Sequence, residues 1–86
     1  MRLHLHSNAI GTRGLEALTA AMERDAFPRL EVLTLQENDV GDFGGLAAAV
    51  TRGALPSIES ILVDDNPGSG SLVRHALRER KKAQSQ

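Results

Sequence analysis

The chain has 86 residues, so it forms at most one small domain with a limited core. Ten Lys and Arg against eleven Asp and Glu give a net charge of −1, which disfavours a dedicated nucleic-acid-binding domain. The absence of cysteine excludes disulfides and thiolate metal sites, and the lack of a leader pattern or a long apolar run predicts a cytoplasmic protein, with a nuclear location as the alternative.

Apolar residues alternate with polar ones in three short segments, and a helical spacing of apolar residues follows each segment. The predicted elements in chain order are a strand at about residues 2–6, a helix at 14–23, a strand at 31–36, a helix at 42–51, a strand at 59–64 and a helix from 71. Consecutive strands that are joined through helices run parallel. We therefore predict a three-stranded parallel sheet with all helices on one side.

The sequence repeats itself at two nearly equal intervals. Asn8 and Asn38 are 30 positions apart, Asn38 and Asn66 are 28 apart, and apolar and glycine positions around them keep the same offsets. Such regular spacing is typical of repeat proteins. The predicted organisation is a segment of three repeats over residues 1–80, at about 1–29, 30–57 and 58–80, followed by a basic and polar disordered tail, 81–86.

The second repeat carries a family resemblance. Its segment LEVLTLQEN matches the pattern L-x-x-L-x-L-x-x-N, and DVGDFGGLAAAV continues it with the glycines and Ala/Leu-rich helix of the long repeat subtype. Over residues 2–78 the chain resembles leucine-rich repeat proteins of the ribonuclease-inhibitor-like subtype. The resemblance implies an α/β solenoid, a horseshoe segment with strands on its concave side and helices on its convex side. It also implies a structural asparagine ladder of Asn8, Asn38 and Asn66.

Three groups of residues could carry chemistry, and each has a structural interpretation that we favour. His4 and His6 project from the same side of a strand, but a zinc site needs three or four protein ligands. The loop at 66–71, NPGSGS, lacks the lysine of a phosphate-binding loop and suits a turn with a serine cap. Asp64 and Asp65 have no nucleophile or base beside them. We expect no metal, no cofactor and no catalytic residue.

Strand positions that alternate with the core should form a solvent-exposed concave face. Its predicted members are His4, His6, Val32, Thr34, Gln36, Glu37, Leu62, Asp64 and Asp65. Residues 1–70 carry a net charge of −5 and residues 71–86 a net charge of +4, so the face is expected to attract a protein with positive charge. The predicted function is a non-catalytic protein–protein interaction module.

Two alternatives to this function remain. The first, which follows from the resemblance, is an accessory part of a horseshoe like that of the Ran GTPase-activating protein. The second belongs to another class, a nucleic-acid or membrane-surface adaptor that acts through the basic C-terminal helix.

The first repeat also presents apolar positions that no earlier residues of this sequence could cover: Leu3, Leu5, Ile10, Leu15 and Leu18. A repeat normally buries its apolar flank against a neighbour. We expect further repeats of the same chain or a second copy to cover this flank.

Overall fold

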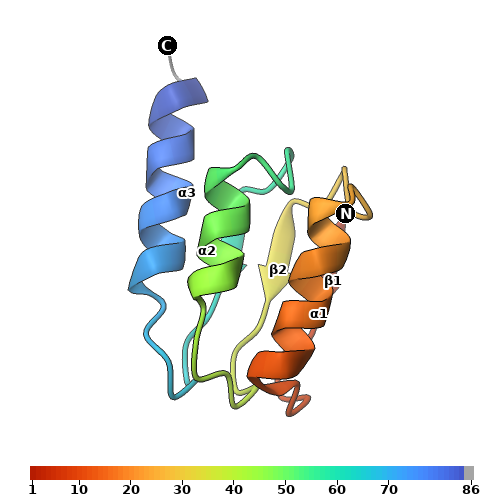
Figure 1. Cartoon of the computed structure of the whole chain (residues 1–86), viewed down its shortest axis with the longest axis vertical. Helices are drawn as coiled ribbons and strands as arrows, with labels where there is room; N and C mark the ends of the chain where they lie inside the picture. Colours follow the sequence, from red (N-terminus) through yellow and green to blue (C-terminus); the bar gives the residue numbers. More distant parts are fainter. Residues whose placement is uncertain (85–86) are drawn as a thin grey trace.

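The computed structural model describes residues 1–84, which form three β-strands and three α-helices in alternation. The elements are β1 (Arg2–His4), α1 (Gly11–Glu23), β2 (Val32–Thr34), α2 (Gly44–Thr51), β3 (Ser60–Leu62) and α3 (Ser71–Gln84). The strands form one parallel sheet in the order β1-β2-β3. The helices lie side by side on one face of this sheet (Figure 1). The predicted α/β arrangement of three parallel strands and three helices is confirmed.

Each regular strand is shorter than predicted, although backbone pairing continues beyond it. Leu5 N donates to Thr34 O at 3.0 Å, and Ser7 N donates to Gln36 O at 2.8 Å. At Ser7 and Glu37 the φ angles are 60° and 55°. A left-handed residue turns the chain out of the extended conformation, so these residues end the pairing and begin the bend toward the next helix.

The helix boundaries differ from the predicted ones at three ends. Helix α1 begins at Gly11, earlier than predicted, and Gly11 supplies a φ of +73° there. Helix α2 begins at Gly44, whose N–H donates to Asp42 Oδ1 at 2.7 Å, so Asp42 lies in the loop before the helix. Helix α3 continues to Gln84, well into the expected disordered tail 81–86; the last two residues of that tail lie outside the described residues.

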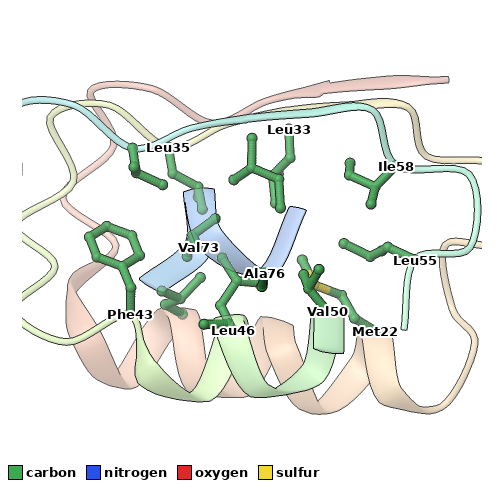
Figure 2. Close-up of a cluster of buried hydrophobic side chains, with 14 of the residues drawn as sticks. Met22, Leu33, Leu35, Phe43, Leu46, Val50, Leu55, Ile58, Val73 and Ala76 are labelled. Carbon is green, nitrogen blue, oxygen red and sulfur yellow. The ribbon is translucent and has the colours of Figure 1, made fainter. Parts of the chain in front are cut away.

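The core lies between the sheet and the helical layer. Figure 2 shows Leu33 and Leu35 of the middle chain segment pointing toward Leu46, Val50 and Val73 of the helices. Helix α2 is apolar on nearly every side because it packs between α1 and α3. Its buried residues are Leu46, Ala47, Ala49 and Val50. The segment of β2 and α2 therefore supplies much of the core.

One predicted flank residue belongs to this core instead. Leu15 is 2% exposed and packs in the central cluster, so the prediction that it lies on the open flank is wrong. The helical stripe of α1 faces the sheet and α2, and Leu15 is on that inner side. Leu3, Leu5, Ile10 and Leu18 remain partly exposed, and they lie at the margin of the cluster.

The bends after the strands pack closely on one another. A Cβ added to Gly68 would lie 2.6 Å from both the carbonyl carbon and the carbonyl oxygen of Gly41. Gly68 N also donates to Val40 O at 2.8 Å. Because backbone atoms cannot move aside as a side chain can, glycine is required at position 68 for this close approach.

Candidate protein-binding face

The nine residues predicted to bind a partner lie on the strands or directly after them. The surface that they form is named the open face: His4, His6, Val32, Thr34, Gln36, Glu37, Leu62, Asp64 and Asp65. The parallel register places His4, Thr34 and Leu62 in one row across the sheet. Glu37 N donates to Asp64 O at 3.2 Å, so the residues after the strands also stay aligned. The fold therefore brings these residues together from segments about 30 positions apart.

Thr34, at the centre of the open face, is buried. Its exposed fraction is 6%, so the prediction that it is solvent-exposed is wrong. Its Oγ1 accepts a hydrogen bond from Leu5 N at 3.1 Å and is hydrogen-bonded to His6 Nδ1 at 3.3 Å. The short side chain also lies between His4 and Leu62 in the row. Thr34 thus supports the face but offers little surface to a partner.

The two histidines lie next to each other on the open face. Their ring centroids are 6.3 Å apart, with an interplanar angle of 78°, and both residues are exposed. In residues 1–84 no group of three or more His, Cys, Asp or Glu gathers that could hold a metal ion. The histidines therefore contribute aromatic edges and hydrogen-bonding nitrogens to the open face, with His6 held in place through Thr34.

The open face also holds an exposed apolar side chain, on β3, and an amide oxygen without a hydrogen-bond partner, after β2. Leu62 is 38% exposed, one of the few large apolar side chains with this much exposure. Gln36 follows Thr34 by two residues and is half-buried, and its Oε1 is buried without a hydrogen-bond partner among the described residues. A buried polar atom without a partner has an energetic cost and calls for an explanation.

Carboxylates gather at the end of the face where the strands finish. Glu37, Asp64 and Asp65 are exposed, and the left-handed φ of 60° at Asp65 matches that at Glu37. Asp64 accepts a hydrogen bond from Arg74 Nη2 at 2.9 Å, and both side chains of this ion pair are more than half exposed. Such a pair contributes about 0–1 kcal/mol. Within residues 1–84, Glu37 and Asp65 form no ion pair, so this end of the face keeps negative charge.

The three repeated asparagines belong to the bends that follow the strands, where Asn38 is buried, Asn66 is half-buried and Asn8 is exposed. Asn38 is fully buried, and its Oδ1 accepts from the backbone N–H groups of Asn8 at 2.9 Å and Ile10 at 3.3 Å. Its Nδ2 donates to Leu5 O at 2.7 Å and to Gln36 O at 3.1 Å. One side chain thus satisfies four backbone groups of two neighbouring bends, which is a structural task.

Asn66 makes the same kinds of hydrogen bond in the bend after β3. Its Oδ1 accepts from Asn38 N at 2.9 Å and Val40 N at 3.0 Å, and its Nδ2 donates to three carbonyl oxygens. The Asn38 and Asn66 side chains therefore link each bend to the neighbouring bend by hydrogen bonds.

Arg80 is a residue whose role the sequence reasoning missed. Its guanidinium donates to Ala54 O at 2.7 Å and Leu55 O at 2.9 Å, and it approaches Val50 O at 3.5 Å. Partial burial lowers the pKa of Arg80 from its ordinary value. Val50 lies in the last turn of α2, and Ala54 and Leu55 follow that helix. Carbonyl oxygens at a helix end commonly need partners from outside the helix, and that general need is a signal that could have pointed to a basic residue. One cation of the basic C-terminal helix thus serves the fold.

No helix of the described chain has the length and apolar character to cross a membrane. Comparisons with protein-family models, with curated proteins and with solved structures gave no match to this chain. The function must therefore be argued from the open face itself.

Proposed function

We propose that this chain is a non-catalytic protein-interaction module of the leucine-rich repeat kind, and that the open face is its binding surface. Two features support the repeat class: strand–bend–helix units recur at offsets of 30 and 28 residues, and asparagines at the same offsets bind backbone groups of the neighbouring bend. In this proposal the strands lie on the concave side of a solenoid segment and the helices on its convex side.

The observation that carries the binding proposal is the exposure of Leu62, a large apolar side chain, on the open face. When a partner covers an exposed leucine, the burial favours binding by about 25 cal/mol for each Å² of apolar area removed from water. Gln36 Oε1 is buried and lacks a donor within residues 1–84, so it gains a hydrogen bond from a partner only if binding moves the Gln36 side chain outward. Protein interfaces combine an apolar centre with a polar rim, and an exposed leucine among the polar residues of the open face fits that arrangement.

The charge of the open face defines the partner further. Glu37 and Asp65 leave negative charge at one end of the face, beyond the Asp64–Arg74 ion pair. A partner segment with an apolar side chain flanked by Lys or Arg fits this surface, because opposite charges speed association and set the orientation. We therefore propose a basic polypeptide segment as the ligand of the open face.

The experiment compares two exposed leucines. Peptides are selected against the protein from a randomised library and then measured against Leu62→Arg and against the control Leu72→Arg, whose parent residue on α3 is 59% exposed. We expect the selected peptides to contain Lys or Arg and to lose about tenfold or more in affinity for Leu62→Arg, while Leu72→Arg binds them unchanged. Peptides that are sensitive to Leu72→Arg alone, or that are acidic, would contradict the proposal.

A further inference from the structure

The two histidines of the open face form a close pair that the proposed function does not use. His4 ends β1, and the backbone pairing with the next strand continues past His6, so the two positions lie on one extended segment. Residues two apart on such a segment project from the same side. Both side chains are exposed, and their ring centroids are 6.3 Å apart. The third histidine of the chain, His75, lies on α3 and is also exposed.

One ring of this pair is oriented by a buried hydroxyl group. His6 Nδ1 is hydrogen-bonded to Thr34 Oγ1 at 3.3 Å, and Thr34 is 6% exposed. Leu5 N donates to the same oxygen at 3.1 Å and so helps to fix its position. The hydrogen bond of one imidazole nitrogen decides which nitrogen is left for a metal ion. When Nδ1–H donates to Thr34, the lone pair of His6 Nε2 is the one that points away from the sheet and is available to a ligand.

The other ring can adjust to meet the first. Among the described residues the His4 ring takes part in no hydrogen bond and contacts His6 edge to face. Zinc–nitrogen bonds of about 2.0–2.1 Å place the ring centroids of two imidazoles on one ion roughly 4.5–5.5 Å apart. The observed separation of 6.3 Å is only slightly larger. A rotation of the exposed His4 side chain therefore brings both rings onto one ion without a change in the backbone.

We propose that His4 and His6 bind one divalent transition-metal ion, of the class that prefers imidazole ligands, such as zinc or copper. Among the described residues no third His, Cys, Asp or Glu joins the pair, so water completes the coordination. A structural zinc site is closed by four protein ligands, whereas a site with two protein ligands is open and exchanges its metal. Thr34 acts as a positioning residue through His6. This site needs no protein partner and is therefore independent of the proposed interaction.

The charged groups near the pair have opposing effects on a bound cation. Arg2 lies on the same side of the strand, two positions before His4, and repels the ion. Asp64 is aligned with His6 across the sheet, two strands away, and attracts it. Both side chains are exposed, so salt weakens both effects. The main source of affinity is chelation: an ion held by one imidazole meets the second at high effective concentration, which strengthens binding by about 10²–10⁴-fold over one imidazole.

The experiment titrates zinc chloride into the isotope-labelled protein at neutral pH and follows the three histidine rings by NMR. We expect the rings of His4 and His6 to shift together and to saturate with one ion per chain, while His75 stays unshifted at that zinc concentration. His4→Asn and His6→Asn should each weaken binding by about a hundredfold, and the control His75→Asn should leave it unchanged. Thr34→Val should weaken binding by about tenfold, whereas Thr34→Ser, which keeps the hydroxyl, should retain it.

Three results would overturn the proposal. The first is equal zinc affinity of the parent and His4→Asn, or equal shifts at His75, because the ion would then bind single imidazoles only. The second is a shift of the pair with magnesium, which prefers oxygen ligands and would indicate a carboxylate site. The third is zinc binding that does not weaken at acidic pH, since a protonated imidazole cannot bind a metal. Thermal melts show whether each variant is folded; if Thr34→Val does not fold, the histidine variants and the two metals still decide.

Discussion

Replacing Leu33 by alanine tests which face of β2 belongs to the interior. Leu33 is 0% exposed and sits at the middle of the central strand, paired with Leu3 on one side and Ile61 on the other. The substitution removes three carbon atoms, a transfer cost of about 2–3 kcal/mol at about 0.8 kcal/mol for each buried CH₂ group. A cavity in a rigid site adds to this cost, so Leu33→Ala should lower the free energy of unfolding by roughly 2–5 kcal/mol.

The size of this loss matters because small domains have little stability to spare. The total free energy of unfolding of a small domain is typically about 5–15 kcal/mol, and a chain of this length falls toward the lower end. Urea denaturation followed by far-ultraviolet circular dichroism measures the change as a shift in midpoint. The control is Leu62→Ala on the open face, which should cost less than about 1 kcal/mol because Leu62 is already partly exposed. If the two variants lost equal stability, or if Leu33→Ala lost less than about 0.5 kcal/mol, the assignment of the faces would be refuted.

Four other substitutions or additions test the remaining parts of the structure. Asn38→Ala should lower the free energy of unfolding by about 3 kcal/mol or more, because it leaves several buried backbone groups unpaired, and chemical denaturation measures it. Arg80→Ala should cost about 1–2 kcal/mol through the lost bonds to carbonyl oxygens, and Arg80→Lys should recover less than half of this in the same assay. Gly68→Ala should cost about 1–3 kcal/mol, because its methyl group would clash with the Gly41 backbone; an unchanged melting temperature would contradict the close contact. Fusing a capping helix–strand unit ahead of Arg2 should raise the melting temperature by several degrees, since about 1 kcal/mol of added stability corresponds to roughly 4–8 °C for a domain of this size. An unchanged melting temperature would contradict the expectation that the flank needs a cover.

The sequence by itself was enough to predict the order of elements and the parallel sheet. Both follow from the spacing of apolar residues along the chain. Alternation at Leu33 and Leu35 favours a strand, and the helical spacing of apolar residues after each asparagine favours a helix. Repetition at 30 and 28 residues strengthens the inference, since one unit predicts the next. The exact ends of the elements were harder to predict. The strand pairing ends at the left-handed residue Glu37, and α2 begins where Asp42 accepts from Gly44 N. The spacing of apolar residues does not reveal either feature.

Alternation predicted the direction of the strand side chains, but not the surroundings of each one. Strict alternation placed Thr34 on the exposed side, and only the packed structure buries it, under hydrogen bonds with Leu5 N and His6 Nδ1. The same holds for Gln36 Oε1, whose lack of a partner among the described residues depends on which neighbours the sheet places around it. Alternation tells which way a side chain points but not what stands beside it.

Contacts between distant segments were decided by the tertiary structure alone. Arg80 reaches the carbonyl oxygens of Ala54 and Leu55 across about 25 positions, and Arg74 reaches Asp64 from the following helix. In the sequence these arginines belong to a basic run that is equally suited to a solvated helix end or an adaptor surface. Local pattern fixes the period and the polarity of each segment, whereas the partner of a charged side chain depends on how helices and loops pack in three dimensions. For that physical reason the sequence determined the order of the strands and helices, and the packing of α3 on α2 decided that Arg80 binds carbonyl oxygens after α2.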